Sequence, residues 1–181
     1  YYNSEFEVKQ KGIGNLVTQA DIETDTFLKN SLTESYPQYG WLSEETRDSP
    51  KRLTKNRTWI VDPLDGTKEF VEGVPNFAIS IGLVENGFPI LGVILNPVTN
   101  DLYTAYKNGG TKFNGNPTFL CQNDNLIEMN ILNSRSETKK GLWKLYKNEF
   151  KELIPLGSIA LKLAMVSANQ ADFIGSLQPK N

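Results

Sequence analysis

The chain has 181 residues, of which 39% are hydrophobic and 22% charged, so it can bury a core and is not expected to be disordered. Its 19 basic and 21 acidic residues leave a net charge of -2, which argues against a nucleic-acid polymer as partner. The longest apolar runs are far too short to cross a membrane. No leader peptide is visible, so we expect a cytoplasmic protein.

The chain contains no histidine and one cysteine, Cys121. This composition excludes an intrachain disulfide framework, Ser-His-Asp and Cys-His catalysis, and zinc sites built on imidazole. Cys121 lacks a histidine base and is a poor candidate for a nucleophile. Any metal would be bound by oxygen atoms, which favours Mg²⁺, Mn²⁺ or Ca²⁺.

The first half of the chain predicts one helix followed by strands. Residues 1–15 are polar and show no pattern, and a helix is expected from Thr18 until Pro37 stops it. Thr18 and Asp21 resemble a capping box at its start. The apolar positions expected to face the core are Ile22, Phe27, Leu28 and Leu32.

A meander of three or four strands is expected in the middle of the chain. The pair Asn86-Gly87 is a strong signal for a hairpin between two of these strands. The expected elements are a short strand or turn at 40–45, a charged loop at 47–56, and strands at 58–61, 76–84, 90–95 and 101–106.

The last third alternates strands with helices, which indicates a second α/β lobe. The expected elements are strands at 126–132, 153–156 and 171–174, an exposed helix at 137–150, and an apolar helix at 159–168. We therefore divide the chain into an N-terminal lobe, residues 1–118, and a C-terminal lobe, residues 119–181.

The string Asp-Pro-Leu-Asp-Gly-Thr at 62–67 is the most informative motif. A buried strand is expected to end at Asp62, a turn to follow at Pro63, and Asp65 to lie beside the first carboxylate. Gly66 would allow close backbone approach, and Thr67 would begin a helix whose free N–H groups attract anions. Two carboxylates beside such a helix start can hold a divalent cation and a phosphate together.

This motif changes how the acidic pair at 44–45 and Asp21 are interpreted. The adjacent pair Glu44 and Glu45 would ordinarily be a solvated surface, and Asp21 an acid that favours a helix start. Mg²⁺, however, needs several anionic oxygens from separate segments, which these residues can supply.

Together these segments resemble the lithium-sensitive, Mg²⁺-dependent phosphatase superfamily, the inositol monophosphatase family. That superfamily includes inositol monophosphatase, fructose-1,6-bisphosphatase and 3'(2'),5'-bisphosphate nucleotidase. The matching segments are 16–21, 42–46, 62–67 and the Gly-Ser pair at 157–158, and the resemblance runs from about residue 16 to 181. It implies an α+β sugar-phosphatase fold, layered α/β/α/β/α, and a homodimer.

The resemblance also implies metal ligands. Glu44, Asp62 and the Leu64 carbonyl would hold a first Mg²⁺, and Asp62 and Asp65 a second. Glu45 would act through water or help to hold a third ion. In the family a Trp-Asp pair follows the segment that corresponds to residues 179–181 and adds a carboxylate. The chain stops before it, so we expect the C-terminal part of the fold to be missing from this sequence.

The implied reaction is the hydrolysis of a phosphomonoester by a metal-activated water. Thr67, oriented by Asp21, would position the attacking water, and the backbone N–H groups of Gly66 and Thr67 would receive phosphate oxygens. A member of the family that binds metal without turnover is a further alternative, but the presence of both Thr67 and Asp21 argues against it.

Two substrate classes compete, and the nucleotide class is preferred. The string from Leu64 to Phe70 and Ser134-Arg135-Ser136 resemble bisphosphate nucleotidases, in which Lys162 would meet a second phosphate. This predicts conversion of 3'-phosphoadenosine 5'-phosphate to AMP and phosphate. The loop at 73–77 and the spacing from the substrate-binding pair Gly157 and Ser158 instead resemble inositol monophosphatases. Ser176 also stands where nucleotidases have an arginine, so inositol 1-phosphate is the alternative substrate.

Overall fold

The structure, a computed structural model, describes residues 1–178 except 3, 5–6, 13–14 and 122, so the segment 179–181 lies outside the described residues. The strands are β1 (Val8–Gly12), β2 (Asn15–Thr18), β3 (Gly40–Ser43), β4 (Arg57–Asp65), β5 (Ala78–Glu85), β6 (Phe88–Asn96), β7 (Asp101–Tyr106), β8 (Gly110–Phe113), β9 (Asn116–Pro117), β10 (Asn130–Ser134), β11 (Glu152–Leu156) and β12 (Phe173–Gly175). The helices are α1 (Gln19–Ser35), α2 (Thr67–Val71), α3 (Arg135–Lys139) and α4 (Ile159–Ser167), with short 3₁₀ helices η1 (Pro50–Thr54), η2 (Leu126–Glu128) and η3 (Leu142–Tyr146).

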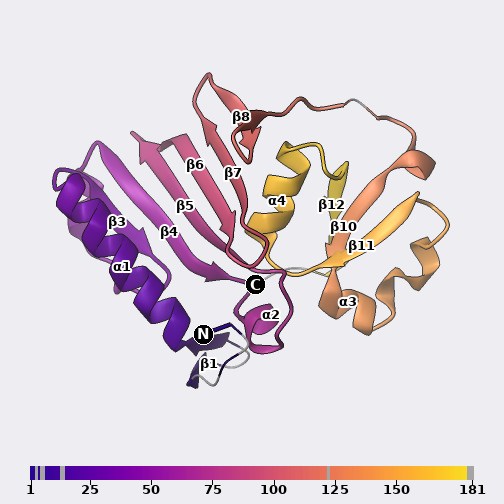
Figure 1. The fold of residues 1–181 in the computed structure, drawn as a ribbon, viewed down its shortest axis with the longest axis horizontal. Helices are drawn as coiled ribbons and strands as arrows, with labels where there is room; N and C mark the ends of the chain where they lie inside the picture. The colour runs from indigo at the N-terminus through magenta and orange to yellow at the C-terminus, as the bar shows by residue number, and fades with distance from the viewer. Residues whose placement is uncertain (3, 5–6, 13–14, 122, 179–181) are drawn as a thin grey trace.

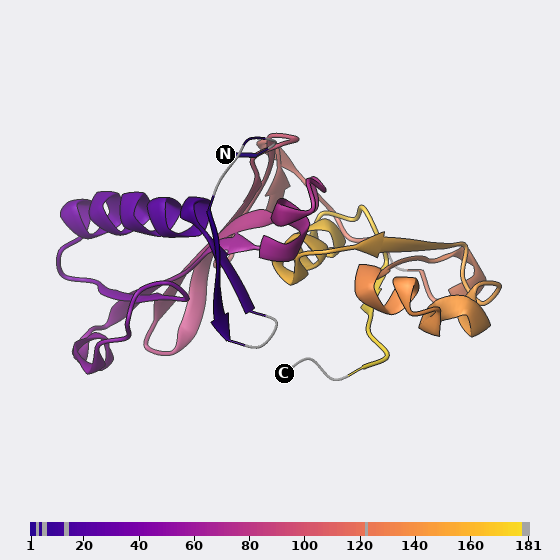
Figure 2. The same cartoon turned by 90° about the horizontal axis from the view of Figure 1, so that it is seen from below.

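The elements are stacked in five layers, which confirms the α+β fold and the order α/β/α/β/α. Helix α1 covers one face of the larger sheet over β3 and β4, and α4 lies between the two sheets (Figure 1). Helix α3 covers the outer side of the smaller sheet, as the perpendicular view in Figure 2 also shows. Because α4 contacts β4, β5 and β6 on one side and β12 on the other, it joins the two sheets.

The larger sheet has seven strands in the order β3-β4-β5-β6-β7-β8-β9. Only β3 and β4 are parallel, and every other neighbouring pair is antiparallel, so the sheet is mixed. The expected meander and its hairpin are confirmed as β5, β6 and β7. Asn86 and Gly87 have φ of 50° and 85°, the positive values that a tight two-residue hairpin needs.

The smaller sheet has β10 in the centre, parallel to both β11 and β12. The strand expected at 126–132 is wrong in its first half, where η2 forms, and the exposed helix expected at 137–150 is also wrong. Helix α3 ends early because Gly141 adopts a left-handed φ of 74°, and η3 follows. Both Glu137 and Trp143 in this segment are buried rather than exposed.

Helix α1 begins where expected but faces the core with different residues. Leu28 and Leu32 pack against the larger sheet, whereas Ile22 and Phe27 are exposed. In the first half of the helix the buried face carries carboxylates instead, among them Asp25. A hydrophobic pattern cannot find a buried face that is acidic, which explains the wrong prediction.

Smaller differences concern segments without an expected structure. The stretch 1–15 contributes β1, which pairs antiparallel with β2, and the charged loop 47–56 contains η1. In the part of the chain that the structure describes, no helix is both long enough and apolar enough to span a membrane.

Candidate active site

Strand β4 carries both aspartates of the motif to the start of α2 (Figure 1). The turn expected directly after Asp62 is wrong, because β4 continues through Asp65 with an irregularity in its pairing to β5 between these residues. Pro63 has no N–H to donate to the neighbouring strand, which accounts for a break in the regular ladder. The Leu64 N–H donates to Oδ1 of Asp62 over 3.1 Å.

Gly66 joins β4 to α2 in a conformation that requires glycine. Its φ is 101°, and a Cβ atom there would lie 3.1 Å from the Asn76 carbonyl oxygen and from Cβ of Phe77. Its carbonyl accepts from the Phe70 N–H at 3.0 Å, which starts α2 directly after the motif. Glycine therefore lets the chain turn here against the segment that leads into β5.

The predicted pairing of Thr67 with Asp21 is present in the structure. The Thr67 hydroxyl lies 3.2 Å from Oδ1 of Asp21 and 3.2 Å from the Leu64 carbonyl oxygen. The other oxygen of Asp21 accepts from the N–H and the hydroxyl of Thr18, at 2.8 and 2.5 Å. The capping box is therefore confirmed, and it fixes a buried carboxylate that reaches the Asp-Gly-Thr motif.

The acidic pair is anchored to the same helix one turn further on. Asp25 accepts hydrogen bonds from the hydroxyls of Ser43 and Thr46, which flank Glu44 and Glu45. Asp25 and Ser43 are both buried, whereas Glu44 is exposed and Glu45 half-buried. Residues four apart lie on one face of a helix, so Asp21 and Asp25 hold the two acidic segments from one surface of α1.

Asp62 lies in an electrostatically unfavourable place. Burial, together with the nearby charges of Asp65, Glu44 and Asp21, raises the pKa of Asp62 from its ordinary 3.8 to about 7, against the lowering effect of the Leu64 N–H. Among the described residues, no three Asp, Glu, Cys or His side chains are already gathered around one point as a metal cluster. The acidic segments are thus close enough to repel one another without converging.

Asp65 connects the motif to the start of α4. Its Oδ2 accepts from the Ser158 hydroxyl at 2.7 Å and from the Ala160 N–H at 2.5 Å. Ser158 also caps α4 by accepting from the Leu161 N–H at 2.9 Å. The predicted substrate residues Gly157 and Ser158 therefore lie beside a predicted metal ligand, although 92 residues or more separate them in sequence.

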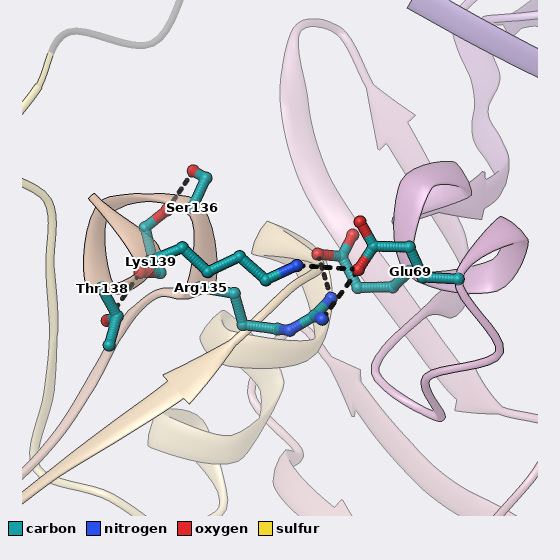
Figure 3. Close-up of polar contacts among 7 residues, drawn as sticks. Glu69, Arg135, Ser136, Thr138 and Lys139 are labelled. Atoms are coloured by element: carbon teal, nitrogen blue, oxygen red, sulfur yellow. Dashed lines mark hydrogen bonds and ion pairs between the residues drawn. The ribbon is translucent and has the colours of Figure 1, made fainter. Parts of the chain in front are cut away.

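The remaining predicted substrate residues are placed differently. Arg135 forms ion pairs with Glu69 at 3.0 Å and Glu72 at 2.8 Å, and Figure 3 shows its guanidinium pointing from α3 toward Glu69. The hydroxyl of Ser134 lies 2.9 Å from that of Ser136. Lys162 is buried within α4 at 5% exposure, so it does not extend into solvent as a surface helix lysine would.

Sequence reasoning missed three acidic residues that hold segments of the structure in place, namely Asp25, Glu69 and Glu137. Asp25 could have been found, because it follows Asp21 by four residues on one helix face. No local sequence pattern identifies Glu69 or Glu137, because their partners are distant in the sequence or follow no regular spacing. Arg135 lies 66 residues after Glu69, and Glu137 accepts hydrogen bonds from residues as far as Gln178.

Two sheets joined by α4, with the acidic motif at the end of β4, form the layered arrangement of the sugar-phosphatase fold. Consistent with this, residues 1–180 match the model of the inositol monophosphatase family. This chain belongs to the inositol monophosphatase family.

Individual relatives agree with that membership. The chain is 34% identical to an inositol monophosphatase of Mesembryanthemum crystallinum and 34% identical to an inositol-1-monophosphatase of Mesorhizobium japonicum, each match covering 92% of this chain. It spans 66% and 65% of the lengths of these relatives, about two thirds in both cases.

Solved structures show the same fold. The extragenic suppressor protein SuhB of Bartonella henselae is 32% identical with a TM-score of 0.83, and the match covers 96% of this chain and 70% of that one. The inositol monophosphatase of Thermotoga maritima is 31% identical with a TM-score of 0.82, covering 94% and 66%.

Proposed function

We propose that this chain forms the principal part of a Mg²⁺-dependent phosphomonoester hydrolase. The observation that carries the proposal is that Asp62 and Asp65 share the end of β4 with the contact between Thr67 and Asp21. Burial and the charges of Asp65, Glu44 and Asp21 also raise the pKa of the half-buried Asp62 to about 7. Such mutual repulsion destabilises a protein unless the charge is compensated. A divalent cation bound among these oxygens compensates it.

The donor set fits a hard cation. The residues that would hold it are Asp62 and Asp65 from β4, the Leu64 carbonyl between them, and Glu44, with Glu45 acting beside them. All supply oxygen, which Mg²⁺ prefers, and the chain contains no histidine to favour zinc. When bound, such ions lower the pKa of water and neutralise charge that develops on a phosphoryl group. Two or three ions per site are part of the proposal.

Thr67 and Asp21 would position the attacking water. A threonine hydroxyl has one proton to donate and lone pairs that can accept. Because the Thr67 hydroxyl faces the Asp21 carboxylate and the Leu64 carbonyl, its proton is directed toward these acceptors. Its remaining lone pair can then accept a hydrogen bond from water and hold that water in line with phosphorus. The N–H groups of Gly66 and Thr67 would receive the phosphate oxygens.

Two phosphate esters are candidates for the substrate. A bisphosphate nucleotide, 3'-phosphoadenosine 5'-phosphate, is supported by the nucleotidase-like Leu64 to Phe70 string, by Ser134 and Arg135, and by Lys162. Inositol 1-phosphate is supported by the names of the relatives, which are inositol monophosphatases. The ion pairs of Arg135 favour the second candidate, because they already occupy a cation assigned to the nucleotide.

The test is phosphate release by the full-length protein with Mg²⁺ from each ester, using wild type, Asp62→Asn and the exposed Asp124→Asn as matched control. We expect release from at least one ester, its loss in Asp62→Asn, and its retention in Asp124→Asn. A clear preference for either ester decides between the candidates. Absence of release from both by the wild type contradicts the proposed function.

A cytoplasmic location, a homodimer and the lobe boundary after residue 118 stay predictions. Cell fractionation, light scattering and limited proteolysis respectively test them.

A further inference from the structure

The two lobes are joined at a second place beside the site, through charged residues. Arg135 and Lys139 of α3 face Glu69 of α2 and Glu72 directly after that helix, as Figure 3 shows for the two cations and Glu69. The Arg135 guanidinium lies 3.0 Å from Glu69 and 2.8 Å from Glu72, and Lys139 lies 3.2 Å from Glu72. These ion pairs connect residues 63 to 67 positions apart in sequence.

The pair of Glu69 with Arg135 is the more buried part of this cluster. The side chains of Arg135 and Glu69 are 16% and 12% exposed, compared with 31% for Glu72 and 60% for Lys139. A planar guanidinium that meets two carboxylates holds a defined orientation, which an ammonium group does not impose. Glu69 is therefore held in place, whereas the pair of Lys139 with Glu72 is a solvated contact of little energetic weight.

Glu69 in turn lies directly against the loop that starts α4. A Cβ atom on Gly157 would be 2.3 Å from both Cγ and Cδ of Glu69, so the Glu69 side chain fills the space beside that glycine. The next residue, Ser158, donates to Asp65. Arg135, Glu69, Gly157, Ser158 and Asp65 thus form one continuous series of contacts from the C-terminal lobe to the acidic motif.

We propose that Glu69 and Arg135 form an interlobe ion pair that positions the Gly157–Ser158 loop and, through Ser158, Asp65. Both are positioning residues. Arg135 does not contact a second phosphate, so its effect on the rate is the same for every substrate. The inference rests on the proposed function for its activity readout, but its structural readout does not. It reassigns an arginine that the sequence places in the substrate site.

The test compares Arg135→Met, Glu69→Gln, the double variant and Arg135→Lys in the full-length protein. Arg57→Met is the matched control, because Arg57 also pairs with a glutamate, Glu85 at 2.7 Å, at the opposite end of β4. For each variant kcat and KM are measured with the bisphosphate nucleotide and with inositol 1-phosphate. Hydrogen exchange is measured at the amides of Ala160 and Leu161.

We expect each single variant to lower kcat by about 10- to 100-fold, the cost of a small misplacement of reacting groups. KM should change by no more than about twofold, by the same factor for every ester that the wild type hydrolyses. The double variant should be no worse than the worse single variant, because the two residues act as one unit. Arg135→Lys should recover part of the rate, and Arg57→Met should match wild type.

Amide hydrogen exchange gives a readout that does not depend on catalytic turnover. The Ala160 N–H is bonded to Asp65 and the Leu161 N–H to Ser158, so both amides should exchange faster in the Arg135 and Glu69 variants. A loss confined to KM for the bisphosphate would overturn the inference and show that Arg135 contacts substrate. Unchanged rates and unchanged exchange would overturn it as well. If the wild type hydrolyses neither ester, the proposed function fails, and exchange alone decides about the ion pair.

Discussion

A half-buried carboxyl group beside the larger sheet and a buried one beside the smaller sheet have opposite pKa shifts. At the end of β4, Asp62 has the Leu64 N–H and three repelling carboxylates around it, and its pKa rises to about 7. In α3, Glu137 is 1% exposed, yet its pKa is lowered. Burial acts to raise the pKa of Glu137, but hydrogen bonds outweigh it; the donors are the Leu177 N–H, the Ser176 hydroxyl, the Trp143 indole and the Gln178 N–H.

The difference separates a carboxylate whose charge is satisfied by hydrogen bonds from one that lies among like charges. Glu137 has its charge satisfied by the chain itself, at distances of 2.8 to 3.3 Å, and so stabilises α3, η3 and the segment after β12. Asp62 is placed among like charges, which a protein tolerates where function requires it. Substitutions around these two carboxylates test the contrast.

Thr67→Val should abolish most activity without harming the fold. It removes the hydroxyl that faces Asp21 and keeps the side-chain volume, so kcat should fall by about 10²- to 10³-fold, as when one positioned polar contact is removed. The Mg²⁺ concentration for half-maximal activity should not change. Steady-state kinetics check this, with Thr33→Val on α1 as control. A wild-type rate in Thr67→Val would remove Thr67 from the proposed mechanism.

Glu137→Gln should destabilise the protein while leaving the acidic motif intact. Replacing a charged acceptor of several hydrogen bonds by an amide weakens them and adds a donor in a buried place, which costs about 2–3 kcal/mol of unfolding free energy. Urea unfolding measures this cost, and the exposed Glu149→Gln serves as control. Equal stability of the two variants would show that Glu137 does not stabilise the fold as described.

Asp25→Asn should weaken metal binding more than catalysis. The loss of a charged acceptor for Ser43 and Thr46 frees the segment that carries Glu44, so the Mg²⁺ midpoint should rise about tenfold, as for residues that orient metal ligands. The rate at saturating Mg²⁺ should stay near that of wild type. Glu34→Gln, an exposed change on the same helix, is the control. An unchanged midpoint would show that Asp25 is purely structural.

A further effect concerns the pH dependence of stability in the protein without metal. Because the pKa of Asp62 is raised from 3.8 to about 7, its contribution to stability is present below about pH 4 and is lost as pH rises toward 7. Glu137, whose pKa is lowered, contributes above its ordinary 4.5 and loses that contribution as pH falls. Asp62→Asn should therefore gain stability relative to wild type between pH 5 and pH 8, measured by thermal unfolding in EDTA. If Asp62→Asn instead gained stability relative to wild type as the pH falls, the pKa of Asp62 would not be raised.

Much of this fold could be predicted because its signals are local. The cap at Thr18, the Asn86-Gly87 hairpin and the apolar helix α4 each depend on neighbouring residues, and the structure confirms all three. The placement of Asp62, Asp65 and Thr67 on one segment could also be predicted from the sequence. The contact of Thr67 with Asp21 could be predicted only through the family resemblance.

The remaining features depend on contacts between distant segments. The helix expected at 137–150 failed because Glu137 is turned inward by donors from 176–178, which no period in the sequence reveals. Arg135 was assigned to substrate by its motif, and only the structure shows Glu69 and Glu72 beside it. In α1, the buried face carries charged residues, so the hydrophobic pattern does not identify the side that packs against the sheet.

We propose that the acidic segments held by α1 and β4 bind the divalent cation. An anomalous difference map from crystals of the full-length protein soaked in Mn²⁺ would locate the ion. We expect a peak in contact with Asp62, accompanied by Asp65 or Glu44, which is absent in crystals of Asp62→Asn. A peak elsewhere, or one that persists in that variant, would show that these segments do not bind the cation.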